Sequence, residues 1–257
     1  MNQNDALLMS EAEFLRRYNP SEYARPSTSV DAAIFTVKDG SLHVLLIKRS
    51  EHPYKDSWTL VGGYIDMESD IDLMATAKRK LEEKTGVKTP YLEQLVTIGN
   101  KSRDPRGWSV TTVYFALIPG AGVELKAGLG ASEIRWAKVS NGKVKEKLGF
   151  DHALLLSDSF ERLRSKVLYT SLPVYLMPKT FSLRDLQKMY ELILNQPLDP
   201  KSFRRRILNA EILAATATLR HNGTRPAQLY RLKKTAPTHF FMRSIEGPIR
   251  SENRASS

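Results

Sequence analysis

The feature that most constrains this chain is a short apolar run that ends in paired glycines and is followed by a helix with a glycine at its end. The run WTLVGG covers residues 58–63, and residues 70–84 repeat apolar side chains at helical spacing before Thr85 and Gly86. Strand-like stretches lie on both sides: VDAAIFTV and LHVLLIKR around an Asp-Gly turn, and later LEQLVTIG, SVTTVYFALI and EIRWAKV. Strands that surround one helix predict an α/β/α sandwich over residues 29–148.

The segment after the paired glycines resembles the Nudix box. Residues 62–87 read GGYIDMESDIDLMATAKRKLEEKTGV, and the family pattern is G-x5-E-x7-R-E-U-x-E-E-x-G-U, where U is aliphatic. Arg79, Glu83 and Gly86 match this pattern. Lysines 80 and 84 replace two of its three helix glutamates, and the interval before the arginine is two residues longer. The resemblance covers about residues 29–145 and implies a Nudix fold.

The two lysines change what this helix can bind. A Mg²⁺ site of this kind needs carboxylates at i, i+3 and i+4, which share one helix face, and one of the three is left. Because ammonium groups repel Mg²⁺, we predict no catalytic residue, no metal and no cofactor. Lysines can still attract a diphosphate where the metal's charge would be. The effector-binding candidates of this segment are Gly62, Gly63, Lys80, Glu83 and Lys84.

A second group of candidates lies in the loop RDPRGW, between two expected strands. A similar D-P-R-G loop lies near the ligand in ADP-ribose-directed Nudix proteins, so the resemblance implies that Arg103 and Arg106 grip phosphate. Arg49, at the end of a strand, and Trp58 are weaker candidates of the same kind. The alternative is a tight turn with solvated charges.

Basic charge is concentrated in the second part of the chain. Residues 1–150 carry 21 Lys and Arg against 19 Asp and Glu, whereas residues 151–257 carry 18 against 9. Such an excess is compatible with nucleic-acid binding and equally with a basic solvated surface. The order of the elements decides between them.

A short basic helix carries the case for DNA. Asp199-Pro200 is a strong helix start, and over the next ten residues Phe203 and Ile207 share the inward face. An amphipathic helix over residues 182–194 precedes it and provides a packing partner. The expected DNA-binding residues on the outward side of the basic helix are Lys201, Ser202, Arg204 and Arg205.

A hairpin with an Asn-Gly turn follows the basic helix. Arg220, Asn222 and Arg225 would lie at its tip, where a DNA-contacting wing carries cations. Helix, turn, basic helix and basic hairpin in this order predict a winged helix-turn-helix domain over residues 149–235. RNA binding lacks support, because no aromatic RNA-recognition strands are present.

A Nudix-like unit followed by FSLRDLQKMYELILNQPLDPKSFRRRIL and RPAQLYR resembles the NrtR family of Nudix-related regulators of NAD metabolism, over about residues 10–235. The resemblance implies an α+β chain that represses genes of NAD synthesis or salvage as a homodimer on a palindromic operator of double-stranded DNA. It also implies that ADP-ribose binds the Nudix domain and changes operator affinity. Residues 1–28 are expected to form an arm with a short helix, and residues 236–257 a disordered tail.

Two other functions stay open at this point. The first is an active ADP-ribose or nucleoside-diphosphate hydrolase with a basic accessory domain, and the second is an RNA-decapping Nudix protein. Both need the carboxylates that lysines replace. No run of residues is long and apolar enough for a membrane helix, and cysteine is absent. Both observations fit a cytoplasmic protein, and the resemblance to the NrtR family implies a bacterial one.

Overall fold

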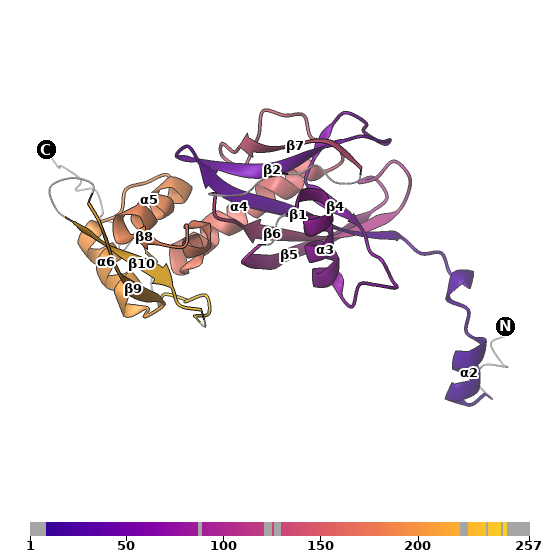
Figure 1. Cartoon of the computed structure of the whole chain (residues 1–257). Coiled ribbons are helices and arrows are strands. Elements are labelled where there is room, and N and C mark those ends of the chain that lie inside the picture. Colours follow the sequence, from indigo (N-terminus) through magenta and orange to yellow (C-terminus); the bar gives the residue numbers. More distant parts are fainter. Residues whose placement is uncertain are drawn as a thin grey trace, which may run out of the picture.

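The structure is a computed structural model that describes residues 9–86, 89–120, 125, 130–221, 226–234, 236–242, 244 and 245. A large mixed sheet with two helices forms one unit, and a smaller helical unit with a three-stranded sheet follows it in the chain (Figure 1). The expected order of a Nudix sandwich followed by a winged helix is confirmed.

The first unit is built on a seven-stranded sheet of mixed direction. The central strand β1 runs antiparallel to β2 and β4 and parallel to β6, and the path of the sheet is β3-β2-β1-β6-β5, with β7 on β2. The elements of this unit are β1 (Ser27–Lys38), β2 (Ser41–Arg49), β3 (Trp58–Thr59), β4 (Val61–Tyr64), α3 (Leu73–Thr85), β5 (Tyr91–Asn100), β6 (Ser109–Leu117), β7 (Ala131–Lys138) and α4 (His152–Tyr169).

Both faces of this sheet are covered, as the side chains of β1 show. Ala32 and Ile34 pack in one cluster with residues of α3, whereas Ala33 and Phe35 pack in another cluster with residues of α4. Successive side chains of a strand point to opposite faces, so a strand that is apolar at every position needs a layer on each side. The result is the α/β/α sandwich.

The helix α3 begins later than its apolar pattern indicates. Asp72 is the N-cap, and its carboxylate accepts from the N–H of Ala75 at 2.6 Å. Asp70 instead forms a two-bonded ion pair with Arg79 on the next turns, one bond being 2.7 Å long. Gly86 ends the helix in the left-handed conformation with φ 68°. The expected helix of 70–84 is therefore Leu73–Thr85.

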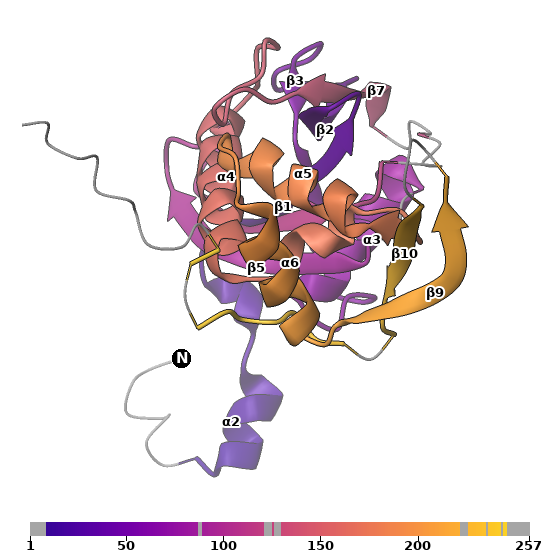
Figure 2. The same cartoon turned by 90° about the vertical axis from the view of Figure 1, so that its left-hand side faces the viewer.

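The second unit is a winged helix. Ser182 and Asp185 form a capping box at the start of α5, and Asp199 caps α6. Phe203 and Ile207 are buried, as their spacing predicts. Figure 2 looks onto this unit and shows α5 and α6 beside the β9–β10 ribbon. Its elements are η2 (Leu172–Leu176), β8 (Phe181–Ser182), α5 (Leu183–Leu194), α6 (Pro200–Asn209), β9 (Leu213–Arg220) and β10 (Ala227–Leu232), with sheet order β8-β10-β9.

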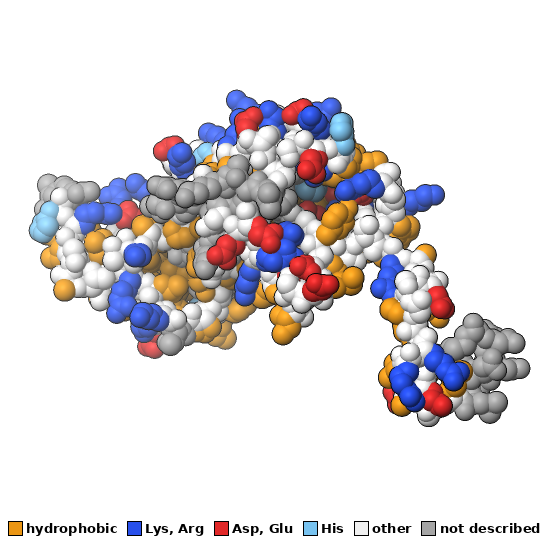
Figure 3. All heavy atoms as spheres, turned by 45° about the vertical axis from the view of Figure 1, so that its right-hand side comes forward, with side chains coloured by type: hydrophobic (Ala, Val, Ile, Leu, Met, Phe, Trp, Pro, Cys, Tyr) orange, Lys and Arg blue, Asp and Glu red, His pale blue; other side chains and the backbone are white. Residues whose placement is uncertain are grey.

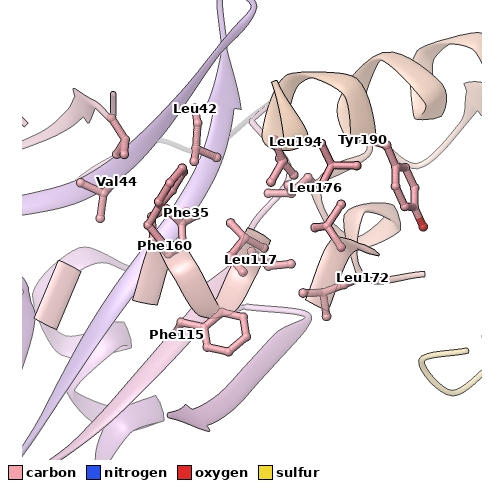
Figure 4. Close-up of a cluster of buried hydrophobic side chains, with 14 of the residues drawn as sticks. Phe35, Leu42, Val44, Phe115, Leu117, Phe160, Leu172, Leu176, Tyr190 and Leu194 are labelled. Atoms are coloured by element: carbon pink, nitrogen blue, oxygen red, sulfur yellow. The ribbon is translucent and has the colours of Figure 1, made fainter. Parts of the chain in front are cut away.

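One apolar core runs through both units. Leu42 of β2, Leu163 of α4, Leu176 of η2 and Leu194 of α5 belong to a single buried cluster. Figure 4 shows Leu42 and Phe35 of the sheet on one side of this cluster and Leu176 and Leu194 on the other. The helix α4 has 18 residues and spans about 27 Å, so one element reaches from the first unit into the second.

The two ends of the chain behave differently. The arm consists of α2 (Glu11–Arg17) and η1 (Pro20–Glu22), neither of which has buried residues, and it stands away from the body (Figure 3). The expectation of a disordered tail is wrong for residues 236–242, 244 and 245. Ile245 is buried there and its N–H donates to the carbonyl of Leu168 at 2.6 Å, and the N–H of Phe241 donates to the carbonyl of Tyr169 at 2.7 Å, so this segment is bonded to the end of α4. Among the described residues, no helix is long and apolar enough to cross a membrane.

Candidate functional site

A pocket of about 230 Å³ opens where β1, β4 and the start of α4 meet. Three arginines and three acids line it, together with His152, the first residue of α4, and Phe150, two residues earlier. The charged side chains that line it are Asp31, Arg49, Glu51, Arg103, Asp104 and Arg106, and its other polar and aromatic side chains include Ser29, His52, Tyr64, Ser109, Phe150 and His152.

Arg103 lies in the wall of this pocket and is almost fully buried, with 6% of its side chain exposed. Its Nε and Nη2 donate to the two carboxylate oxygens of Asp151 at 3.0 and 3.1 Å, and Nη2 lies 3.4 Å from Asp31 Oδ2. Its Nη1 lies 3.4 Å from Ser109 Oγ. A buried guanidinium is stable only when its donors and its charge are matched, and two carboxylates match it here.

His152 continues this polar network from the first residue of α4. Its Nδ1 accepts from the N–H of Leu60 at 2.9 Å, and its Nε2 lies 3.6 Å from Asp31 Oδ1. Burial lowers the pKa of the His152 imidazole more than the neighbouring carboxylates raise it. The ring is therefore neutral near pH 7, with its one hydrogen on Nε2 toward Asp31.

The other two arginines of the pocket are held more loosely. Arg49 Nε donates to the carbonyl of Pro53 at 2.7 Å, and among the described residues no carboxylate lies within 4.0 Å of its guanidinium. Burial lowers the pKa of Arg49, although it stays charged at neutral pH. Arg106 pairs with Asp104 at 2.7 Å and is 47% exposed. Both guanidinium groups can therefore donate to an anion that enters the pocket.

The one glutamate of the Nudix metal-binding pattern that remains on α3 is held in ion pairs. Glu83 accepts from Arg79 at 3.0 Å and from Lys80 at 3.1 Å. Burial raises the pKa of Glu83, but these two hydrogen bonds outweigh that effect and lower it overall. Among the described residues, no three His, Asp or Glu side chains are grouped to hold a metal ion. The donor set of α3, two cations on one carboxylate, does not fit Mg²⁺.

Gly62 and Gly63 line the pocket. Two side chains pass so close to their backbone that a Cβ has little room at either position. A Cβ on Gly62 would lie 2.2 Å from Asp31 Oδ1 and 2.5 Å from the carbonyl oxygen of Val30. A Cβ on Gly63 would lie 3.1 Å from Cδ of Lys80, whose stem crosses that glycine. The paired glycines therefore make room for Asp31 and Lys80.

The structure brings together only part of the effector set that the sequence indicates. Arg49, Gly62, Gly63, Arg103 and Arg106 all line the pocket, whereas the described parts of the other candidates do not. The Trp58 ring is buried under the guanidinium of Arg135 at 3.9 Å, because β7 pairs with β2 beside it. Lys80 and Glu83 lie outside the lining, on α3, and the side chain of Lys84 is outside the described residues.

Three residues of the site were missed by sequence reasoning: Asp31, Asp151 and His152. Asp31 carried a signal, since a lone acid within the apolar strand VDAAIFTV is costly to bury without a partner. Asp151 and His152 carried none, because they resemble an ordinary helix start. The partner of Asp151, Arg103, lies 48 residues away in the chain, and the partner of His152, Leu60, lies 92 residues away.

The outward face of α6 is the second candidate site. Lys201, Arg204 and Arg205 are exposed, and the N–H of Ser202 donates to the Asp199 cap at 2.9 Å. In the space-filling view, blue Lys and Arg side chains are spread over the winged-helix unit at the left (Figure 3). A short helix that buries its apolar side and exposes its cationic side can bind a polyanion such as DNA.

The expected wing tip is described only at its base. Arg220 Nη2 donates to Asp185 at 2.7 Å and to Ser182 Oγ at 3.1 Å, so this guanidinium ties the end of β9 to the start of α5. Asn222 and Arg225 lie outside the described residues.

Comparisons with known proteins agree with both units. Residues 27–157 match the NUDIX domain family, and residues 173–232 match the NrtR DNA-binding winged helix domain. A relative from Acinetobacter baylyi, described as "ADPR responsive transcriptional repressor NtrR", is 45% identical over 95% of this chain and 97% of its own length.

Solved structures resemble the chain over the same range. The crystal structure of Shewanella oneidensis NrtR complexed with a 27mer DNA has a TM-score of 0.78 and 42% identity, covering 85% of this chain and 99% of that one. The NUDIX domain of that protein complexed with ADP-ribose has a TM-score of 0.57 and 43% identity, covering 60% of this chain and 99% of that one. The chain therefore belongs to the NrtR family, in which a NUDIX domain precedes a winged-helix DNA-binding domain.

Proposed function

We propose that this protein is a transcriptional repressor whose DNA affinity changes when ADP-ribose binds the arginine-lined pocket. The observation that carries the proposal is the single core that joins this pocket's unit to the basic winged helix through α4. Among the described residues, no flexible linker separates the pocket from the DNA-binding surface, so an anion bound in the pocket can change the position of that surface. The regulated genes are those of NAD synthesis or salvage, and the protein acts in the cytoplasm.

The pocket suits the diphosphate of ADP-ribose. Arg49 has backbone carbonyls as its partners, and Arg106 lies half-exposed at the rim, so both can turn donors toward phosphate oxygens. The diphosphate would lie between these two arginines and Arg103. Lys80 adds positive charge from α3, outside the pocket lining, and Lys84 adds a second positive charge to the same helix.

The chain binds this ligand without a metal and does not hydrolyse it. Glu83, the carboxylate left in the metal-binding pattern, is neutralised by Arg79 and Lys80. An activated water needs a metal or a general base, and these ion pairs supply neither. Calorimetry with ADP-ribose in EDTA should give the same affinity as in Mg²⁺, and no AMP should form in Mg²⁺ or Mn²⁺. Turnover of about 1 per second would identify an enzyme instead.

DNA is held by α6 and the wing of two copies. Ten residues of α6 span about 15 Å, which reaches only a few base pairs. Specific binding within a genome needs more contacts, so a homodimer on a palindromic site is expected. Lys201, Ser202, Arg204 and Arg205 supply the contacts of the helix, and Arg220, Asn222 and Arg225 belong to the wing.

One titration tests the proposal. Duplexes selected from a random pool by the protein are sequenced, and a selected duplex is labelled and titrated at fixed salt with and without ADP-ribose. A two-fold symmetric sequence and an affinity that changes with ADP-ribose are expected. An affinity that ADP-ribose leaves unchanged, while calorimetry shows the ligand bound, would contradict the repressor mechanism.

A further inference from the structure

The residues that fix the start of α4 also line the pocket. His152 accepts the N–H of Leu60 at 2.9 Å, and both of these residues are in the lining. Asp151 receives two hydrogen bonds from Arg103, which is in the lining as well. A ligand in this pocket therefore touches the groups that position the first turn of α4.

The carboxylate of Asp151 lies at the start of α4 but is bonded to Arg103. Asp151 is the N-cap residue of α4, a position where aspartate ordinarily accepts from the N–H groups of the first turn. Here its side chain makes no such capping bond and pairs with Arg103 instead. The first turn of α4 thus gives up its side-chain cap in favour of an ion pair across the pocket wall.

We propose that Asp151 is a two-position switch, bound to Arg103 without ligand and capping α4 when a diphosphate takes Arg103. The inference rests on the proposed function, since it concerns how ADP-ribose in that pocket acts on DNA binding. A diphosphate and the Asp151 carboxylate are both anions, and they compete for the same guanidinium donors. Asp31, the second carboxylate on Arg103, stays in place because Thr111 Oγ1 donates to it at 2.8 Å.

The far end of α4 carries this change into the winged helix. The carbonyl of Thr170, the C-cap of α4, accepts from the Tyr190 hydroxyl of α5 at 2.8 Å. Leu163 and Val167 pack in the same core as Leu186 of α5. A shift of the first turn therefore displaces a rigid rod whose other end is fixed to the DNA-binding unit.

Asp151→Asn tests the switch, and Asp104→Asn is its matched control. Each change removes one negative charge beside a pocket arginine, Arg103 in the first case and Arg106 in the second. Both should bind ADP-ribose more tightly. The wild type and Asp104→Asn should show an effect of ADP-ribose on DNA affinity of about 5-fold to 150-fold, and Asp151→Asn an effect within about 2-fold.

Hydrogen exchange at the first turn of α4 gives a readout independent of DNA. In the wild type, ADP-ribose should slow exchange of the Ala153 amide, because the Asp151 side chain then caps it. In Asp151→Asn this amide should exchange slowly from the start, since asparagine also caps. In Asp151→Ala it should exchange fast with and without ligand.

The outcomes separate this inference from the proposed function. If the wild type binds ADP-ribose but its DNA affinity does not change, the proposed function fails, and hydrogen exchange still decides the switch. An exchange rate of the Ala153 amide that ADP-ribose leaves unchanged would overturn the switch. An undiminished ligand effect on DNA affinity in Asp151→Asn, or an equal loss in Asp104→Asn, would overturn it too.

Discussion

The pocket and the outward face of α6 both collect arginines, but they hold them in opposite ways. Arg103 is 6% exposed and bonded to two carboxylates, whereas Arg204 and Arg205 stand in solvent. A buried guanidinium has a fixed direction and a high cost of losing its partners. A solvated one is mobile, screened by salt and cheap to remove. The first arrangement suits a small anion of one shape, and the second suits a long polyanion.

The largest expected difference between the two regions is in stability. Arg103→Ala leaves the buried carboxylate of Asp31 and the half-buried carboxylate of Asp151 without the guanidinium that bonds both, so the free energy of unfolding should fall by roughly 3–5 kcal/mol. Arg205→Ala should change it by no more than about 0.5 kcal/mol. Urea unfolding of both variants measures this. Equal losses would mean that the network around Arg103 contributes no more than a solvated charge.

The next effect concerns the ligand. Arg49→Met should weaken ADP-ribose binding by roughly 1.5–3 kcal/mol, because it removes the charged donors of a pocket guanidinium. Among the described residues, no carboxylate is paired with that guanidinium. Lys48→Met is the control on the same strand, since Lys48 pairs with Glu133 at 2.7 Å outside the pocket lining. Calorimetry in EDTA compares the two. An Arg49→Met variant with wild-type affinity would remove Arg49 from the site.

DNA binding should respond to the exposed arginines of α6. Arg204→Ala with Arg205→Ala should flatten the slope of log affinity against log salt by about 0.9 for each side chain that contacts phosphate. If Arg205 reads guanine, its loss should also cost roughly 1–3 kcal/mol and relax base preference. Arg164→Ala, an exposed arginine of α4, is the control. Anisotropy at several salt concentrations measures the slopes, and an unchanged slope would contradict phosphate contact by α6.

The smallest effect is expected from α3. Lys80→Glu reverses a charge that lies near the pocket but outside its lining, so ADP-ribose affinity should fall by about 1 kcal/mol or less through solvent. Lys78→Glu, exposed on the same helix, should leave the affinity unchanged. A loss much larger than this in Lys80→Glu would place its ammonium group on the ligand itself.

Local sequence rules account for much of the fold. Asp199-Pro200 predicts the start of α6, Gly86 predicts the end of α3, and the spacing of Phe203 and Ile207 predicts the buried side of α6. Each rule works because the determining residues are neighbours along the chain.

The pocket was less predictable because its partners are distant in sequence. By sequence, Arg103 is a cation in a loop, and the residues near it give no sign that Asp151 will bind it. Trp58 is a candidate for ligand binding by sequence, but the pairing of β7 with β2 places Arg135 over its ring. Such contacts arise only when the sheet has closed, so a single sequence shows the residue types and not their partners.

The core shared by the sheet, α4 and α5 also decides which parts of this protein can be exchanged. A cut anywhere between α4 and η2 would expose apolar faces on both products, Leu42 and Phe35 on one and Leu176 and Leu194 on the other. The DNA-binding product would then need a new cover for Leu176 and Leu194 in any other protein. A hybrid protein that keeps this DNA-binding unit must therefore also keep α4 and the face of β1 and β2 that packs against it. The apolar interface between the two units has to be exchanged together with either unit.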